Sequence, residues 1–285
     1  MIGVTGATGA LGGRVAARLA ERGVELRLIV RDAERAPSLP GAEVAEAAGY
    51  DDGDAMARAF AGVDTLFLVS AGEHPDRVSL HRSAIDAATA AGVERVVYTS
   101  FLAAAPDTTF TFGRDHFHTE EHIKAAGLGY TFLRDSMYLD YVPFFASADG
   151  VIRGPAGDGR VGAVARDDVA GTAVAALLDP VHEGRTYEVT GRQAYTLAEA
   201  AQILTHFTGR EVVYVEETLE EARASRAPSG APDWEIEGWV TSYAAVAEGD
   251  LDVVTDTVLR LTGDDPMTLP DFLEAHPDSW AHLRS

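Results

Sequence analysis

Glycines stand at every third position of the segment Thr5-Gly6-Ala7-Thr8-Gly9-Ala10-Leu11-Gly12, which follows a short apolar run. In this pattern Gly6 lets the chain turn sharply, and Gly9 removes a Cβ where a phosphate must approach the backbone. Gly12 lets the following helix pack closely on the strand. The N–H groups and the dipole at the start of that helix favour negative charge. The segment therefore predicts a pyrophosphate-binding turn, with a purely structural glycine turn as the alternative.

A second informative position lies at the end of the next apolar run, Leu28-Ile29-Val30-Arg31-Asp32. In dinucleotide-binding folds a carboxylate here bonds to the ribose 2′-hydroxyl of NAD, whereas an arginine accommodates the 2′-phosphate of NADP. Arg31, with Arg35 one helical turn later, favours NADP(H). Asp32 keeps NAD open, and a surface ion pair of Arg31 with Asp32 or Glu34 is the alternative without a ligand.

The lysine content limits the proton chemistry. Lys124 is the only lysine, and no tyrosine has a lysine four residues later. Ordinary short-chain dehydrogenases need such a pair, because the lysine lowers the pKa of the tyrosine that moves the proton. Reduction of a quinone does not need it, since the charge spreads over two oxygens and the cofactor carries the chemistry. His116 and Tyr138 are the candidates for proton donor or substrate contact, with a structural role as the alternative for each.

The segment His118-Thr119-Glu120-Glu121-His122 matches the H-x-x-E-H pattern of some zinc proteases. Two histidines four residues apart can share a metal ion. The segment falls where a crossover helix is expected and no third ligand suggests itself, so we expect an exposed helix face and no metal site. Ser100 lacks the G-x-S-x-G turn of hydrolases, which favours a contact to a bound molecule over a nucleophile.

Short apolar runs alternate with helical patterns through the first half of the chain. We expect strands at Met1–Thr5, Glu25–Arg31, Ala42–Glu46, Thr65–Ser70, Glu94–Thr99 and Gly129–Arg134. We expect helices at Leu11–Arg22, Asp54–Ala61, Asp76–Ala91 and Arg114–Ala126. Alternating strands and helices of these lengths indicate βαβ units and a parallel sheet covered on both faces. The sequence therefore predicts an α/β fold with a Rossmann-type, doubly wound parallel sheet.

The second half is less regular. We expect helices at Asp167–Leu178 and Thr196–Phe207, the latter opened by a Thr196–Glu199 capping box, and strands at Arg185–Val189 and Glu211–Val215. The segment Ala224–Pro232 is rich in small residues, proline and glycine, and is either a mobile loop or lid, or simply a connector. We expect residues 1–150 to form an NAD(P)-binding Rossmann domain. Residues 151–285 would complete the sheet and form a smaller C-terminal α/β lobe that binds the substrate.

Charge and hydropathy narrow the class of partner. The 285 residues carry a formal net charge of −22, from 23 basic and 45 acidic residues. Such a surface repels nucleic-acid phosphates and anionic membranes, so we expect a small-molecule partner, no nucleic acid and no membrane. The start of the chain lacks a basic leader followed by an apolar run, and no apolar stretch reaches 18 residues. We therefore expect a cytoplasmic protein.

Several segments together carry a family likeness: the glycine loop, the Arg-Asp pair after the second strand, Leu68–Gly72, Tyr98–Phe101 and Thr131–Tyr138. They resemble the NmrA-like atypical short-chain dehydrogenase/reductase family, and within it the bacterial NAD(P)H:quinone oxidoreductases of type 2. The likeness continues through Gly154–Gly162, Gly184–Gly191 and Thr262–Phe272, and so covers nearly the whole chain.

The resemblance implies which residues contact NADP(H). They are Gly6, Ala7, Thr8, Gly9, Ala10, Leu11, Arg31, Tyr50, Val69, Ser70, Ala71, Thr99, Ser100, Ser136, Met137 and Tyr138. The last three would line the nicotinamide. The chain departs from the family pattern at Gly49, where relatives have an aspartate, and at Glu121, where they have a lysine. Lys124 either replaces that lysine or is a surface residue.

The resemblance also implies an NADPH-dependent oxidoreductase that reduces a quinone or a similar conjugated, electron-poor small molecule by hydride transfer. The missing lysine and the missing Tyr–Lys pair motivate an alternative, a non-enzymatic NAD(P)-binding redox sensor that acts through a protein partner. Relatives occur as monomers and homodimers, and both states remain open.

Overall fold

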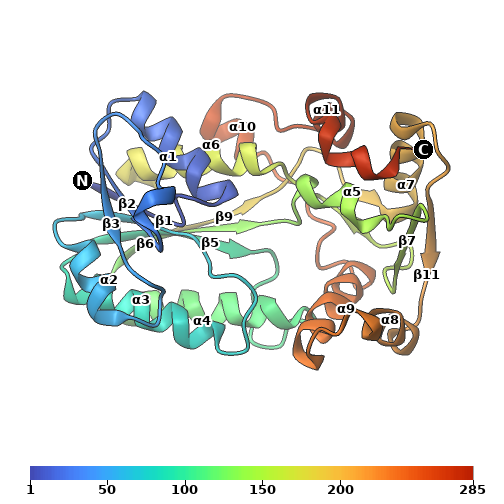
Figure 1. Ribbon diagram of the computed structural model, residues 1–285, viewed down its shortest axis with the longest axis horizontal. Helices are drawn as coiled ribbons and strands as arrows, with labels where there is room; N and C mark the ends of the chain where they lie inside the picture. Colours follow the sequence, from blue (N-terminus) through green and yellow to red (C-terminus); the bar gives the residue numbers. More distant parts are fainter. Residues whose placement is uncertain (285) are drawn as a thin grey trace.

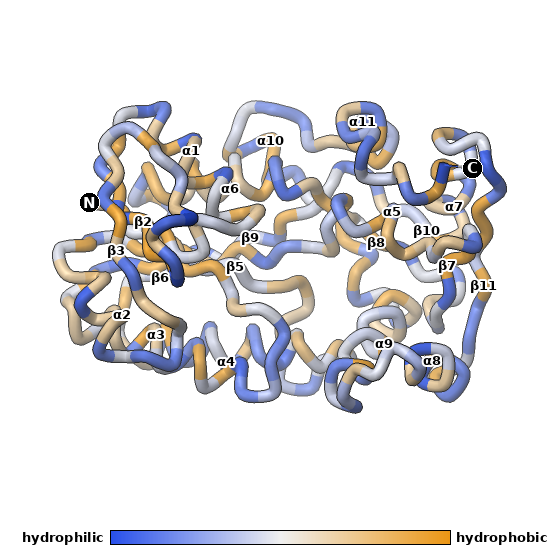
Figure 2. The backbone as a smooth tube through the Cα atoms, viewed as in Figure 1, coloured by the Kyte–Doolittle hydropathy of each residue, from blue (hydrophilic) through white to orange (hydrophobic). Residues whose placement is uncertain are grey.

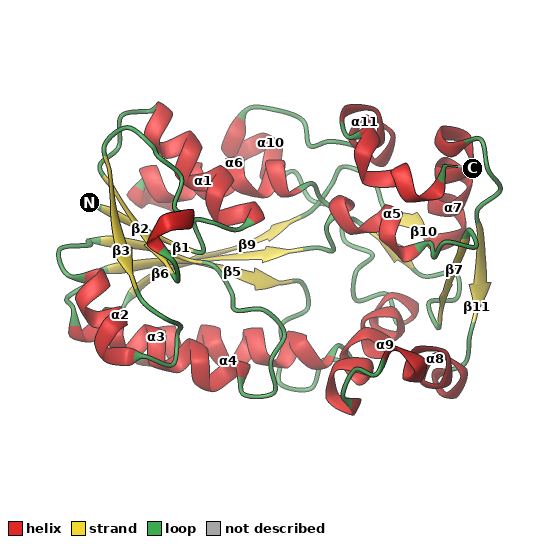
Figure 3. Cartoon of the chain, viewed as in Figure 1, coloured by secondary structure: helices red, strands yellow, loops and turns green. Residues whose placement is uncertain are grey.

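A seven-stranded parallel sheet forms the centre of the protein, whose computed structural model describes residues 1–284 (Figures 1 and 3). In spatial order its strands are β3 (Ala42–Glu46), β2 (Leu26–Val30), β1 (Ile2–Thr5), β4 (Thr65–Leu68), β5 (Arg95–Phe101), β6 (Gly129–Asp135) and β9 (Arg185–Val189). The chain builds outward from β1 to β3 and then crosses to β4 on the other side. This reversal is the topological switch point where doubly wound sheets bind ligands. The predicted Rossmann-type fold is confirmed.

Helices cover both faces of the sheet (Figure 1). One face carries α1 (Ala10–Glu21), α6 (Arg166–Leu178) and α10 (Thr257–Thr262). The other face carries α2 (Gly53–Phe60), α3 (Arg77–Ala90) and α4 (Thr111–Ala125). No helix within residues 1–284 combines the length and apolar character needed to cross a bilayer.

Each face of the sheet has its own apolar core. Adjacent residues of β5 show the division, because Val97 packs in the core under α1 and α6, whereas Val96 and Tyr98 pack in the core under α3 and α4. Side chains alternate along a strand, so a strand buried on both faces reads as an unbroken apolar run. Figure 2 shows this hydrophobic run along the central strands. Burial of each large side chain stabilises the fold by about 1.5–3 kcal/mol.

The second half of the chain adds strand β9 to the sheet and helices α6 and α10 to one of its faces. It also builds a lobe beyond the carboxyl ends of the strands (Figure 1). The lobe has a parallel pair, β7 (Val151–Gly154) with β11 (Val213–Glu216), and an antiparallel pair, β8 (Arg160–Val161) with β10 (Tyr195–Thr196). Its helices are α5 (Val142–Phe145), α7 (Leu197–Thr208), α8 (Leu219–Arg226), α9 (Asp233–Ala247) and α11 (Leu269–Ala275). A functional division at residue 150 stays a prediction.

Two predicted elements of the second half are confirmed. The Thr196–Glu199 capping box opens α7, and β9 has the predicted bounds. The segment Ala224–Pro232 ends α8, makes a 3₁₀ turn at Ala227–Ser229 and leads into α9. Proline and glycine here stop one helix and start the next, as expected of a connector. Closure of this segment over a ligand stays a prediction.

Asp168, in the first turn of α6, fastens the lobe to the Rossmann core. Its half-buried carboxylate accepts a hydrogen bond of 2.9 Å from the backbone N–H of Met267, just before α11. Burial, with a smaller contribution from the neighbouring Asp167, raises the pKa of Asp168 to about 6. Holding this carboxylate ionised at neutral pH therefore costs the folded state free energy.

We expect Asp168→Asn to gain stability relative to the unchanged protein as the pH rises. The folded-state pKa of about 6 lies above the unfolded value of ~3.9, so protonation stabilises the folded state below pH ~4. That stabilisation is lost as the pH rises through about 6, whereas asparagine stays neutral and still accepts from Met267. Urea titrations at several pH values measure the free energy of unfolding of both proteins. The value for Asp168→Asn minus that for the unchanged protein should increase as the pH rises. A constant or falling difference would contradict the raised pKa of Asp168.

Candidate active site

The predicted pyrophosphate turn lies between β1 and α1, at the switch point of the sheet. Gly6 has a φ of +61°, in the left-handed region, and a Cβ on Gly12 would lie 2.4 Å from the Gly6 carbonyl oxygen. No side chain caps α1, and its first turn holds no acid. Within residues 1–284 the N–H groups of Ala10, Leu11 and Gly12 have no acceptor. The turn therefore fits an anion held by backbone donors.

Arg31 stands exposed at the end of β2, and the acids around it are already bonded elsewhere. Asp32 Oδ1 accepts from the N–H of Glu34 at 3.0 Å, and Glu46 accepts from the N–H of Ala33 at 3.0 Å. Within residues 1–284 Arg31 makes no ion pair and no side-chain hydrogen bond. The predicted alternative of a surface pair with Asp32 or Glu34 is not observed, which leaves the guanidinium available to a phosphate.

Side chains hold the segment that follows β4, where Val69, Ser70 and Ala71 were predicted to contact the cofactor. The Tyr50 hydroxyl donates to the Val69 carbonyl at 2.6 Å and lies 2.7 Å from Thr5 Oγ1. Thr5 Oγ1 in turn accepts from the N–H of Val69 at 2.9 Å. The hydroxyl of Tyr50 therefore holds the backbone of this segment. The half-buried ring of Tyr50 is the part of the side chain that remains available to a ligand.

The two hydroxyls at the end of β5 have different surroundings. Thr99 Oγ1 accepts from the N–H of Ser70 at 2.8 Å, and its own proton has no acceptor within residues 1–284. Ser100 Oγ donates at 2.6 Å to Glu120, a nearly fully buried carboxylate that also binds Arg134 through two hydrogen bonds of 2.9 and 2.6 Å. Ser100 thus faces α4, because side chains alternate along the strand. The proton of this hydroxyl is engaged within the protein, and the contact of Ser100 with the cofactor stays a prediction.

The position of the family lysine lies on the outer surface of α4. Glu121 is exposed and pairs at 2.8 Å with Lys124, so Lys124 is a surface residue and not a substitute in the site. His122 pairs with Asp86 at 2.7 Å, and His118 is exposed. No group of three or more potential metal ligands occurs among residues 1–284.

His116, a predicted proton donor or substrate contact, is buried next to the end of β5. Its Nδ1 lies 2.9 Å from the Tyr98 hydroxyl, and its ring stacks on Phe101. Burial, with the charge of Arg77 nearby, holds the pKa of His116 well below its usual value. The imidazole is therefore neutral near pH 7 and can serve as a hydrogen-bond donor, but not as a charged acid.

The other candidate, Tyr138, is committed to a different partner. Its hydroxyl donates at 2.9 Å to Asp135, a buried carboxyl whose pKa burial raises well above its usual value. Burial and Asp135 raise the pKa of Tyr138 as well, which disfavours proton release. The ring packs against the core under α1 and α6, on the opposite side of the sheet from His116. The predicted role of Tyr138 as proton donor is not supported by this geometry.

The remaining nicotinamide-side residues flank Tyr138. Ser136 is buried, and its hydroxyl has no hydrogen-bond partner among residues 1–284. Met137 is half-buried and packs against the core of the lobe. Ser136 therefore offers an unused donor at the end of β6, and Met137 forms the contact between the strand ends and the lobe.

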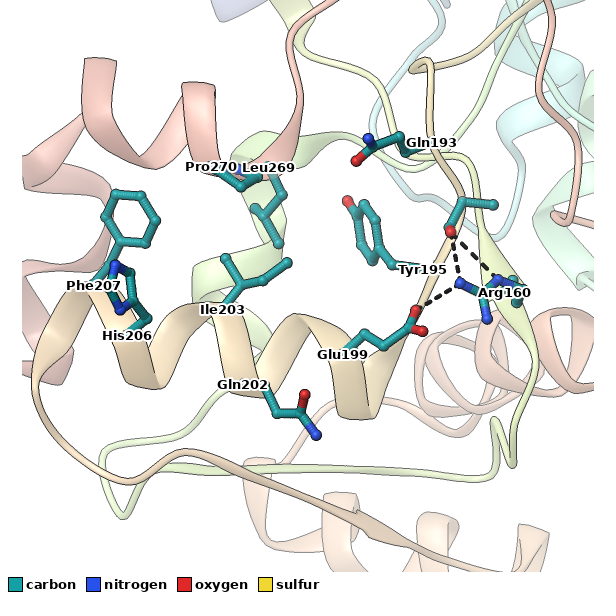
Figure 4. A pocket seen from close by; sticks show the side chains of 11 residues that line it. Arg160, Gln193, Tyr195, Glu199, Gln202, Ile203, His206, Phe207, Leu269 and Pro270 are labelled. Atoms are coloured by element: carbon teal, nitrogen blue, oxygen red, sulfur yellow. Dashed lines mark hydrogen bonds and ion pairs between the residues drawn. The ribbon is translucent and has the colours of Figure 1, made fainter.

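A pocket of about 870 Å³ lies wholly within the lobe, between α7 and the start of α11 (Figure 4). Its lining includes Tyr195, Ile203 and Phe207, with Arg160 and Glu199 paired at one end. None of the lining residues comes from the glycine loop or the strand ends. This pocket is therefore separate from the predicted dinucleotide site.

We expect Gly12→Ala to abolish dinucleotide binding and to destabilise the protein by about 1–3 kcal/mol, the usual cost of overpacking. The added Cβ would meet the backbone of Gly6 and Thr5, which cannot move without opening the turn. Thermal unfolding and cofactor titration check this. Gly53→Ala is the matched control, since its Cβ meets nothing closer than 3.5 Å and alanine favours the helix. Normal binding by Gly12→Ala would contradict the close approach.

Comparison with known proteins identifies the family. A family model described as NAD(P)H-binding matches residues 6–180, from the glycine loop through α6. The chain is 34% identical over 280 residues to the NAD(P)H azoreductase of Xenophilus azovorans, covering 97% of this chain and 98% of that protein. It is also 34% identical to quinone oxidoreductase 2 of Escherichia coli (strain K12), covering 95% and 96%.

A solved structure supports the same relationship. The crystal structure of the NADPH-dependent quinone oxidoreductase of Escherichia coli complexed with NADPH superposes with a TM-score of 0.88 at 33% identity, covering 96% of this chain and 99% of that one. The predicted resemblance to a family that includes quinone oxidoreductases is confirmed. The chain belongs to the NAD(P)H-binding family, and it is an NAD(P)H-dependent oxidoreductase.

Proposed function

We propose that the protein reduces a quinone or a similar conjugated, electron-poor small molecule with NADPH. The backbone donors of the glycine loop would hold the pyrophosphate, and Arg31 would hold the 2′-phosphate. The observation that carries the choice of NADPH is the unpaired guanidinium of Arg31 beside acids that cap the backbone. The bound cofactor would supply the hydride. The relatives named as quinone and azo reductases support this substrate class.

In this proposal His116 stabilises the charge that develops on the substrate. The Tyr98 hydroxyl, whose pKa burial raises, keeps its proton and donates to His116 Nδ1. The proton of the neutral imidazole then stands on Nε2, which has no partner within residues 1–284. Hydride addition to a quinone leaves negative charge on oxygen, and an Nε2–H donor stabilises that anion until water supplies the proton.

The alternative of a sensor without turnover is less well supported. The two relatives that match over nearly the whole chain are named an azoreductase and a quinone oxidoreductase. We further propose that the protein acts in the cytoplasm as a monomer or homodimer and binds no nucleic acid. The net charge of −22 supports the last point.

We expect Arg31→Ala to weaken NADPH binding about 10–100-fold, because charge-assisted bonds to phosphate contribute about 1.5–3 kcal/mol. NADH binding should change less than about twofold, since NADH has no 2′-phosphate. Calorimetric titration of both cofactors checks this. Arg58→Ala removes an exposed arginine of α2 and is the control. Equal weakening of NADPH and NADH binding would contradict the assignment of Arg31 to the 2′-phosphate.

We expect quinone reduction to show no histidine inflection between about pH 6 and 8, because the pKa of His116 lies well below this window. His116→Phe should lower kcat about tenfold or more and leave the Kd of NADPH unchanged. Stopped-flow absorbance of the reduced nicotinamide measures both quantities. His118→Ala, on the exposed face of α4, is the matched control. An inflection near pH 6.5, or full activity of His116→Phe, would rule out this role.

A further inference from the structure

The backbone of the segment after β4 is bonded to side chains almost completely. The N–H groups of Val69 and Ser70 donate to Thr5 and Thr99, and the Val69 carbonyl accepts from Tyr50. The next residue, Ala71, is held from the α3 side. Its N–H donates to His81 Nε2 at 2.8 Å, and its carbonyl accepts from Arg77 Nε at 2.9 Å.

We propose that Arg77 and His81 are positioning residues that fix the Ala71 segment for the nicotinamide half of NADPH. The inference rests on the proposed function and extends it to α3, where no sequence motif marks either residue. The two side chains are four residues apart and so project from one face of the helix. One holds the carbonyl and the other holds the N–H of the same residue, which defines the orientation of Ala71.

His81 can hold Ala71 because its tautomer is fixed. Nε2 accepts from Ala71, so the ring proton stands on Nδ1 and is donated to Thr119 Oγ1 at 2.8 Å. The Thr119 hydroxyl donates in turn to the Asp115 carbonyl at 2.7 Å. Burial and the charge of Arg77 lower the pKa of His81 to about 3, so this donor chain keeps its direction across the physiological range.

Arg77 has an unusual environment for a cation. It is only 7% exposed, and no carboxylate within residues 1–284 forms an ion pair with it. The Nε–H bond to Ala71 is the only hydrogen bond of its side chain in the described part of the chain. Burial raises the pKa values of the nearby acids Glu73 and Asp115, and the charge of Arg77 partly offsets this shift without a direct ion pair. The direct contact of the guanidinium is therefore the carbonyl of Ala71, at the edge of the predicted dinucleotide site.

The arrangement leaves one set of polar groups free for a ligand. Within residues 1–284 the carbonyl and the hydroxyl of Ser70 have no hydrogen-bond partner. Arg31 marks the adenosine half at the end of β2, and the pyrophosphate turn follows β1. The next strand in the sheet is β4, so Ser70 faces the nicotinamide half.

The test compares two probes, NADPH and adenosine 2′,5′-bisphosphate, which lacks the nicotinamide half. We expect Arg77→Met and His81→Phe to weaken NADPH about tenfold in calorimetric titrations and to leave the bisphosphate within about twofold. The KM for NADPH in quinone reduction should rise by the same factor, with kcat at saturation within about threefold. Arg31→Ala should weaken both probes, because both carry the 2′-phosphate, and Arg82→Gln, exposed on α3, should behave as the unchanged protein.

Conservative variants separate positioning from packing. Arg77→Lys keeps a donor and His81→Gln keeps both an acceptor and a donor, so each should recover most of the lost affinity. If His81→Phe does not fold, Thr119→Val keeps the buried shape, removes the acceptor of Nδ1–H and should weaken NADPH alone by about threefold.

Three results would overturn the inference: unchanged NADPH affinity in Arg77→Met and His81→Phe, equal loss for both probes, or no recovery in the conservative variants. Failure of the unchanged protein to bind NADPH would instead overturn the proposed function. The two failures are therefore distinguishable.

Discussion

The close approach of α1 to the end of β1 is the constraint on which the site depends. Gly12 leaves no room for a Cβ above the Gly6 carbonyl, so the helix start is drawn over the switch point of the sheet. The first N–H groups of α1 are left without acceptors within residues 1–284. A helix start that lacks both a cap and an acid is a cost to the isolated fold that an anionic ligand removes.

Around this turn, polar side chains hold the backbone at the ends of the strands. Thr5, Tyr50 and Thr99 bond to the segment after β4, and Arg77 and His81 complete its support from α3. Buried polar groups are costly when unpaired, so a network satisfied within the protein fixes one geometry. The groups left without a partner within residues 1–284, at Ser70, Thr99 and His116, are those that we propose to contact the ligand.

The positions of the acidic side chains also leave Arg31 free to bind an anion. The chain is strongly acidic, yet the acids nearest the adenosine end cap a short 3₁₀ turn and leave Arg31 unopposed. The buried carboxylate of Glu120 pairs with the half-buried Arg134, and Glu121 pairs with the sole lysine at the surface. Anion binding therefore relies on local donors in a protein whose overall field repels anions.

The doubly wound sheet, the glycine turn and the family could be predicted from the sequence alone, because strand periodicity and glycine spacing are local signals. It did not separate Ser100, whose hydroxyl donates to Glu120, from Thr99, whose hydroxyl accepts from Ser70, and it did not show that Tyr138 bonds to Asp135. His81 and Arg77 carry no motif, and their contact with Ala71 exists only once α3 packs on the sheet. Tertiary structure decided these roles, because hydrogen-bond partners depend on packing and not on sequence spacing.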